Sequence, residues 1–309
     1  MEQSAVGSAL RGSVRWEELL PAAFRRRLAA CPIVYLPLGI CEPHGQIAAF
    51  GLDTIKAVWL CEQAARMTGG IVAPAVGYQI HETGYHARWL EEVVGEENPH
   101  MTAMPPDVML RFFLYQLRAF ANAGFKGIVA VTGHSGGNQF DYRLVAERFA
   151  RRTGVQVFVA SDPELTGGRY EGDHAGRYEI SQLLYVRPDL VDMDAAALTT
   201  APGSGGRLAL GDDYREASPE LGKRIMEACL DGLRAAAGQM LETIRAKANA
   251  AGPEPAPPLG YAEMEALWAE LAASRDAWRT ASPAAGQPPV GAGSRWKALE
   301  RLSSRQGHT

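Results

Sequence analysis

Cysteine is scarce in this sequence, and no two cysteines have the spacing of a zinc ribbon. The four are Cys31, Cys41, Cys61 and Cys229, with no CxxC pair among them. We therefore expect buried thiols in a reducing, cytoplasmic compartment. Apolar runs long enough for a signal peptide, or for the roughly 18 residues of a membrane span, are also missing. A membrane is therefore not an expected partner.

The sequence also lacks an excess of positive charge. Lys and Arg number 31 against 35 Asp and Glu, which gives a formal net charge of −4. This balance does not favour a nucleic acid as partner. Hydrophobic residues make up 47% of the 309 residues and charged residues 21%. That composition is typical of a globular protein and excludes a wholly disordered chain.

Short apolar, β-rich runs alternate with longer amphipathic runs from Ile33 to Gly252. This alternation favours βαβ units that build a mostly parallel sheet. Four near-continuous apolar runs are expected to be strands covered on both faces. The strands are expected to start at Ile33, Ile71, Gly127 and Val155, with helices at 54–67, 106–123 and 139–152. The predicted fold class is α/β, in three layers, with helices flanking a mostly parallel β-sheet.

The chain divides into three predicted regions. Residues 1–30 form an N-terminal segment, and residues 31–250 form the domain that would carry the chemistry. Residues 251–309 combine a Pro-rich linker, a peripheral helix at 261–278 and a flexible tail, which we expect to lie away from the chemistry. Within the domain, 77–104 lacks a clear period, so we expect a long loop, and such loops are usually functional.

Histidine and carboxylate side chains gather just after the first predicted strand. Glu42 and His44 lie two positions apart and point the same way if the backbone stays extended, and Asp53 follows shortly before a helix. Carboxylate and imidazole are suitable ligands for Zn, Mn or Fe. Each residue alone has a plainer interpretation: Asp53 as a helix N-cap, and Glu42 or His44 as a satisfied polar group in a turn.

Two further clusters follow later strands. The run VTGHSGGNQF contains His134 and opens a helix, and its glycines serve either close approach to a ligand or a sharp strand-to-helix turn. In GDHAGRYEISQLL, His174 lies at the start of a predicted helix, and Glu179 on its largely apolar face needs a cation or a hydrogen-bond partner if buried. Because binding groups in open α/β folds gather at the carboxyl ends of strands, the three clusters together indicate a dinuclear metal site.

As a set, these motifs resemble those of the creatininase family, also called creatinine amidohydrolases. GICEPHG at 39–45 and GLD at 51–53 are similar to the family's G-S-x-E-Q-H-G and G-T-D. TGHSGGN at 132–138 is similar to N-G-H-G-G-N, and HAGRYEIS at 174–181 to H-A-G-x-x-E-T-S. The resemblance includes the order and intervals of the motifs and spans roughly residues 33–193.

The resemblance implies two divalent metal ions, with Zn²⁺ as the first choice and Mn²⁺ or Fe²⁺ as alternatives. It also implies a small-molecule substrate and a homo-oligomer, often a ring-like hexamer. The implied ligands are Glu42, His44, Asp53, His134 and Glu179, with Asp53 bridging the ions. His174 would transfer protons beside the metals, with Glu179 as the other member of the catalytic pair. Asn138 would orient its turn or contact substrate.

Several positions depart from the family pattern. Pro43, Gln46, Ser135 and Arg177 replace its usual residues without removing an implied ligand. Because these positions touch the pocket wall, we do not expect creatinine itself to be the substrate. Creatininase proper has a glutamate where this chain has Gly136, and for that reason the ligand role is given to Glu179.

Four other residues are candidates for contact with substrate. Arg177 could anchor a carboxylate or phosphate, although a surface salt bridge is the plainer interpretation. His81, His86 and Trp89, in the predicted loop, could contact a planar or polyhydroxylated ring or could lie on the surface. The run HETGYH is not the HExxH of zincins, because its two histidines are five residues apart.

The predicted activity is hydrolysis of a cyclic amide or related C–N bond by a metal-activated water. One alternative is hydrolysis of a C–C bond in a cyclic diketone of the inosose type, or of an N-formyl or peptide bond. An alternative of another class is a catalytically inactive oligomeric binding scaffold. A scaffold would be expected to have lost metal ligands, and this chain retains all five.

Overall fold

The computed structural model describes residues 12–198, 209–251 and 257–302. At its centre is a parallel four-stranded sheet in the order β2-β1-β3-β4. The strands are β1 (Ile33–Leu38), β2 (Ile71–Val72), β3 (Gly127–Thr132) and β4 (Gln156–Ser161). Every residue of β1 and β3 is buried, as expected for strands covered on both faces.

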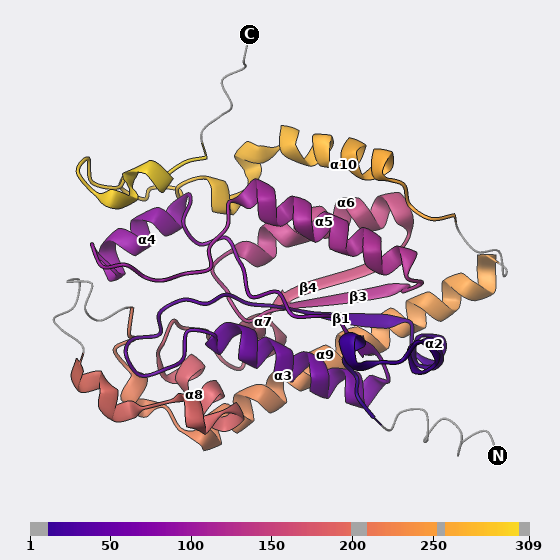
Figure 1. Cartoon of the computed structure of the whole chain (residues 1–309), viewed down its shortest axis with the longest axis horizontal. Helices are drawn as coiled ribbons and strands as arrows, with labels where there is room; N and C mark the ends of the chain where they lie inside the picture. Colours follow the sequence, from indigo (N-terminus) through magenta and orange to yellow (C-terminus); the bar gives the residue numbers. More distant parts are fainter. Residues whose placement is uncertain (1–11, 199–208, 252–256, 303–309) are drawn as a thin grey trace, which may run out of the picture.

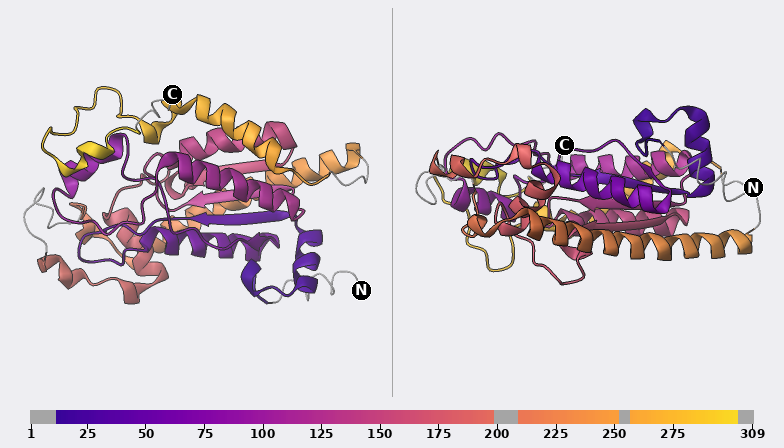
Figure 2. Two further views of the ribbon diagram at one scale, coloured as in Figure 1. Left: turned by 45° about the horizontal axis from the view of Figure 1, so that its top comes forward. Right: turned by 90° about the horizontal axis from the view of Figure 1, so that it is seen from below.

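Helices cover both faces of this sheet and confirm the predicted three-layer α/β fold (Figure 1). One face carries α5 (Pro106–Asn122) and α6 (Asn138–Thr153), with α10 (Tyr261–Ala273) packed against both. The other face carries α3 (Leu52–Thr68) and α9 (Pro219–Ala251), and α8 (Arg177–Val186) packs against these two helices. Figure 2 shows α9 running along the length of the molecule.

Shorter elements complete the described chain. They are the helices α2 (Pro21–Ala30), α4 (Tyr85–Val93) and α7 (Asp162–Leu165), and the 3₁₀ turns η1 (Trp16–Glu18), η2 (Pro188–Leu190), η3 (Met193–Leu198), η4 (Tyr214–Glu216), η5 (Arg275–Ala277), η6 (Arg279–Ala281) and η7 (Arg295–Leu299). None of the described helices is long and apolar enough to cross a membrane. All four cysteines are free thiols, and Cys41 alone among them is not fully buried.

The core follows from the alternation of side chains along the strands. In β1, Leu36 and its even-numbered neighbours enter the layer under α5 and α6, while Ile33 and Tyr35 enter the layer under α3 and α9. Burying each large aliphatic side chain contributes roughly 1.5–3 kcal/mol before entropy is counted. The two apolar layers therefore fix the sheet and, with it, the loops at the ends of its strands.

The structure corrects two sequence-based expectations. The strand expected from Ile71 is only two residues long in the sheet, since the next donors to β1, Ala73 and Val76, are three residues apart while their acceptors, Tyr35 and Pro37, are two apart, which breaks the regular pairing. The loop expected at 77–104 contains α4, whose buried Ala87 and Leu90 pack with Val290 and Trp296 from the C-terminal segment. The apolar surface that stabilises α4 lies about 200 residues away in the chain, so no local pattern revealed it.

The C-terminal region extends across the molecule instead of ending at α10. Residues 252–256 of the predicted linker and 303–309 of the predicted tail lie outside the described residues. The predicted peripheral helix is α10, which ends at Ala273, earlier than expected. Beyond it, η6 and η7 contact α4, a contact that the sequence did not predict.

Loops that follow β1, β3 and β4 lie at one edge of the sheet, where parallel strands have their carboxyl ends. Figure 1 shows α4 and α8 at this end of the molecule, opposite α2. The loop after β3 lies very close to the start of α3. The evidence is that a Cβ atom added at Gly133 would overlap the carbonyl oxygen of Asp53. Glycine at position 133 therefore brings Asp53 next to the ends of the central strands.

Candidate metal centre

All five predicted metal ligands meet at the carboxyl end of the sheet. They come from the loop after β1, the first turn of α3, the loop after β3 and the first turn of α8. The five residues are Glu42, His44, Asp53, His134 and Glu179, and each is at most 4% exposed. The structure therefore supports the convergence that a metal site requires.

The candidate ligand atoms of these five residues form two sets that share Asp53, and two further groups, Glu42–His44–His174 and His81–His86–His134, also lie close enough together to hold an ion. His134 Nδ1 lies 2.8 Å from Glu42 Oε1 and 3.6 Å from Asp53 Oδ2. His44 Nε2 lies 3.7 Å from Asp53 Oδ1 and 3.5 Å from Glu179 Oε2. Donors at about 2.0–2.2 Å from one tetrahedral ion would be about 3.3–3.6 Å apart. Most of these separations are near that range, and Asp53 offers one oxygen to each set.

Several ligand atoms have no partner of their own. Glu42 Oε2, His44 Nε2 and both carboxylate oxygens of Asp53 are buried without a hydrogen bond among the described residues. Buried polar atoms are nearly always satisfied, so this group of atoms fits a bound cation. Asp53 does not cap its helix, since Gly51 is the N-cap residue of α3. The N-cap interpretation of Asp53 is therefore wrong.

Behind the ligands lies a buried cation that the sequence reasoning missed. Lys56 Nζ donates to Glu179 Oε1 at 2.7 Å and lies 3.4 Å from Asp162 Oδ2 and 3.6 Å from Asp53 Oδ1. Burial would lower the pKa of Lys56, but the carboxylates of Asp162 and Glu179 outweigh it and raise that pKa. Lys56 lies one helical turn after Asp53, and Asp162 directly follows β4, and these two positions were the available signals.

Negative charge dominates the centre even with Lys56 present. Asp53, Asp162 and Glu179 surround the Lys56 ammonium group, and the buried Glu42 adds a fourth carboxyl group to the centre. Burial raises the pKa of Asp162 to about 6, against the opposing effect of Lys56. For Glu179, burial would raise the pKa, but Lys56 and His44 lower it to about 2. At neutral pH the centre therefore needs further positive charge.

In the metal-free chain that charge comes from two imidazoles. Burial would lower the pKa of His134, but the carboxylates of Glu42 and Asp53 raise it to about 10. Asp53 and Glu179 likewise hold the pKa of His44 well above its usual 6.5, against the effect of burial. The same two imidazoles outweigh the burial of Asp53 and hold its pKa well below its usual range. A metal ion would have to displace protons from His44 and His134.

His174 lies at the rim of the centre. Its side chain is 22% exposed, and its Nδ1 lies 3.8 Å from Glu42 Oε1 and 4.0 Å from Glu179 Oε2. The Nε2 atom lies 3.0 Å from the Pro43 carbonyl oxygen, and the ring stacks on His44 with 4.9 Å between centroids. His174 is therefore close to the ligands and reachable by solvent, as proton transfer requires.

Trp89, His81 and His86, which were predicted to contact substrate, all lie near the candidate metal ligands. Trp89 is half-buried and stands edge-on to both His174 and His81, with 5.0 Å between ring centroids in each case. His81 and His86 are buried beside His134 and not on the surface. Contact of these three residues with substrate stays a prediction.

Asn138 and Arg177, which were also predicted to contact substrate, have hydrogen-bond or ion-pair partners within the protein. The Asn138 amide is fully buried, accepts from the Ile80 N–H at 3.1 Å and donates to the Ile80 carbonyl at 2.9 Å. Asn138 thus orients the chain before His81. The exposed Arg177 guanidinium lies 3.0 Å from Glu216 and 3.5 Å from Asp213, in agreement with the surface salt bridge. Substrate binding by Asn138 or Arg177 stays a prediction.

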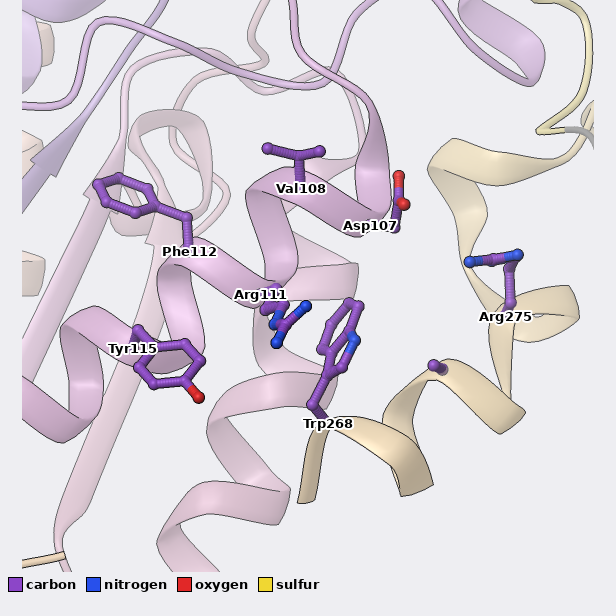
Figure 3. Close-up of a pocket in the computed structure, with 8 residues that line it drawn as sticks. Asp107, Val108, Arg111, Phe112, Tyr115, Trp268 and Arg275 are labelled. Atoms are coloured by element: carbon purple, nitrogen blue, oxygen red, sulfur yellow. The ribbon is translucent and has the colours of Figure 1, made fainter. Parts of the chain in front are cut away.

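A separate hollow of about 620 Å³ lies between α5 and α10 (Figure 3). Its lining consists of Asp107, Val108, Arg111, Phe112, Tyr115, Trp268, Ala272 and Arg275. None of the predicted ligands lines it, and its polar groups include a single carboxylate, from Asp107. The chemistry is therefore not expected in this hollow.

Relatives with known activities resemble this chain over most of its length. Creatinine amidohydrolase from Pseudomonas putida is 26% identical over 264 residues, which cover 73% of this chain and 95% of the relative. A 3-dehydro-scyllo-inosose hydrolase from Thermotoga maritima is 25% identical over 203 residues, covering 62% of this chain and 61% of the relative. Both relatives are hydrolases by name.

Solved structures show the same fold. A crystal structure of creatinine amidohydrolase (creatininase) superposes with a TM-score of 0.61 at 24% identity, covering 74% of this chain and 97% of that one. An Mn creatininase and a mutant creatininase of Zn-Zn type give TM-scores of 0.60 and 0.59 at 23% identity, each covering 73% of this chain and 97% of theirs. At these identities the likeness establishes the fold alone.

The family model of creatininase, described as creatinine amidohydrolase, matches residues 17–237. This match covers well over half of the 309 residues and includes every predicted metal ligand. The resemblance seen in the motifs is thereby confirmed, and the chain belongs to the creatininase family of metal-dependent amidohydrolases.

Proposed function

We propose that this chain holds two divalent metal ions that share the carboxylate of Asp53. Glu42 and His134 would complete one set of ligands, and His44 and Glu179 the other. The observation that carries the proposal is the division of these buried atoms into two sets with one residue in common. The Mn and Zn-Zn forms of related creatininases support Zn²⁺ or Mn²⁺ as the metal. When bound, such a pair activates a water molecule and polarises a substrate carbonyl.

The chain's own residues then have distinct tasks. Lys56, 2.7 Å from Glu179, keeps that carboxylate ionised and oriented toward the centre. His174, close to Glu42 and partly exposed, would carry a proton to the leaving group. Trp89, edge-on to His174, would form an apolar wall that limits water at the site.

The proposed substrate is a small polar molecule with a cyclic amide or a related C–N bond. The relative from Pseudomonas putida supports this bond type. A Cβ atom at Gly136 would lie 2.6 Å from His134 Nε2 and 2.7 Å from His86 Nε2. His86 thus fills the space that a side chain at this position would take. Because creatininase proper carries a glutamate there, we expect a pocket of different shape and a substrate other than creatinine.

A second candidate reaction is the hydrolysis of a C–C bond in a cyclic diketone. It is supported by the similarity to the 3-dehydro-scyllo-inosose hydrolase. Assays of the metal-loaded protein on lactams, formamides and inosose-type diketones would separate the two reactions. Turnover of a lactam but not a diketone supports the amide reaction, and the reverse supports the C–C reaction.

The scaffold alternative is tested by metal content. We expect elemental analysis to find close to two ions per native chain and far fewer in Asp53→Ala. Absence of metal after incubation with Zn²⁺ and Mn²⁺ would favour the inactive scaffold. Homo-oligomerisation is also proposed from the resemblance, and light scattering of the native chain would measure it.

A further inference from the structure

His81 lies between two of the proposed metal ligands. Its Nδ1 is 2.9 Å from His134 Nε2, and its Nε2 is 3.4 Å from Glu42 Oε2. The ring is 3% exposed, so water does not compete freely for either nitrogen. Within the described part of the chain, neither His81 Nε2 nor Glu42 Oε2 has a hydrogen bond of its own. Each ring nitrogen of His81 therefore faces a different ligand of the same set.

One arrangement of protons satisfies these contacts when an ion is bound. The Nδ1 atom of His134 faces Glu42 and Asp53, so it must be free of a proton to bind the ion. The single proton of His134 then lies on Nε2 and is donated to His81 Nδ1. His81 is left with its own proton on Nε2, which points toward Glu42 Oε2. If His81 instead carried its proton on Nδ1, that N–H group would face the N–H group of His134 Nε2.

The position of His81 is fixed from several sides. The preceding residue, Ile80, is held through both backbone groups by the Asn138 amide. The His86 ring stacks on His81 with 4.5 Å between centroids, and Trp89 lies against its edge. Two residues further along, the Thr83 hydroxyl donates to the Thr280 carbonyl at 2.6 Å. This last anchor belongs to the C-terminal segment, beyond the part that matches the family model.

We propose that His81 is a positioning residue that fixes the His134 tautomer and orients Glu42, and so controls the affinity of one ion. The ion concerned is the one held by Glu42, Asp53 and His134. The ion held by His44, Asp53 and Glu179 should be little affected, because the two ring nitrogens of His81 face His134 and Glu42 and not His44 or Glu179. This inference rests on the proposed pair of ions. Loss of such an outer partner typically lowers metal affinity roughly 10–100-fold.

The test uses the full-length, metal-free chain titrated with Zn²⁺ against a chromophoric chelator. His81→Leu removes both ring nitrogens at similar volume, and we expect one of two sites to weaken roughly 10–100-fold and the other by less than about threefold. His81→Asn keeps an acceptor near the position of Nδ1, so it should recover most of the lost affinity. His100→Asn, which removes the imidazole of an exposed histidine whose φ of 49° asparagine tolerates, is the control and should leave both sites unchanged.

A spectroscopic measurement separates a positioning role from a merely structural one. In the Zn²⁺-loaded protein with ¹⁵N-labelled histidine, NMR should show protons on Nε2 of both His81 and His134. It should also show metal ligation at His134 Nδ1 and at no nitrogen of His81. This measurement uses the native sequence, so it remains decisive even if a His81 variant folds poorly.

Contrary outcomes are distinct from failure of the proposed function. If the native chain binds two ions and His81→Leu binds them with unchanged affinities, the positioning role is wrong. Equal weakening of both sites, or a signal for metal bound to His81 itself, overturns it as well. If the native chain does not bind two ions, the proposed function fails first.

Discussion

Lys56 offers a stringent test of the electrostatic description of the centre. Its ammonium group is 1% exposed and faces the carboxylates of Asp53, Asp162 and Glu179. The substitution Lys56→Met keeps the length of the side chain and removes the charge. Three buried carboxyl groups would then be left without their shared cation. Such removal of one partner from a buried ion pair typically costs about 3–5 kcal/mol.

This cost should appear as a lower melting temperature of the metal-free chain. For a protein of 309 residues the entropy of unfolding is roughly 0.65 kcal/mol per kelvin, so 3–5 kcal/mol corresponds to a fall of roughly 5–8 °C. With Zn²⁺ present the fall should be smaller, because bound ions would neutralise Asp53 and Glu179. Differential scanning calorimetry with and without a chelator measures both values.

A matched control is available on the surface. Lys223 forms an exposed pair with Glu227 at 3.9 Å on one face of α9. Lys223→Met should change the stability by only about 0.3–0.5 kcal/mol. If metal-free Lys56→Met melted within about 2 °C of the native chain, our assignment of Lys56 as the balancing cation would be wrong.

Three further predictions concern His174, His134 and Asp141. His174→Ala should retain both ions and lower turnover roughly 10²–10⁴-fold, whereas loss of an ion on elemental analysis would make His174 a ligand. His134 has a pKa of about 10 in the metal-free fold against an ordinary 6.5, so its contribution to stability is complete below pH 6.5 and disappears as pH rises to about 10. Melting temperatures of the chelated chain should fall over that window, and a constant value would contradict the assignment. Asp141→Ala removes the acceptor for the backbone N–H groups of Arg279 and Thr280. The opening free energy that hydrogen exchange reports for η6, and for α4 which contacts it, should therefore fall by about 1–3 kcal/mol, while that of β3 should not change.

Much of the fold could be predicted because its determinants are local. The strand starting at Ile33 and the helices between strands carry their own periodicity, and the structure has them within a few residues of the expected bounds. The helix α4 could not be predicted, since its apolar face is complemented by Trp296, far away in sequence. Local patterns do not contain that partner.

The candidate site likewise has features that the sequence predicted and features that only the structure revealed. The ligand types and their places after strands were visible in the motifs, and parallel strands necessarily bring such residues to one edge. The sharing of Asp53 between two sets depends on how α3 meets the loop after β3, at Gly133. Lys56 was overlooked because a lysine in an amphipathic helix is usually exposed. Its burial becomes evident only when the neighbouring carboxylates are placed.

The proposed centre depends on one carboxylate, that of Asp53, serving two ions. Anomalous diffraction at the zinc absorption edge, from crystals of the Zn²⁺-loaded chain, tests it most directly. We expect two peaks about 3.5–4 Å apart, one on each side of Asp53, beside Glu42 and His134 in one case and beside His44 and Glu179 in the other. A single peak at the centre, or two peaks that do not share Asp53, would contradict the claim.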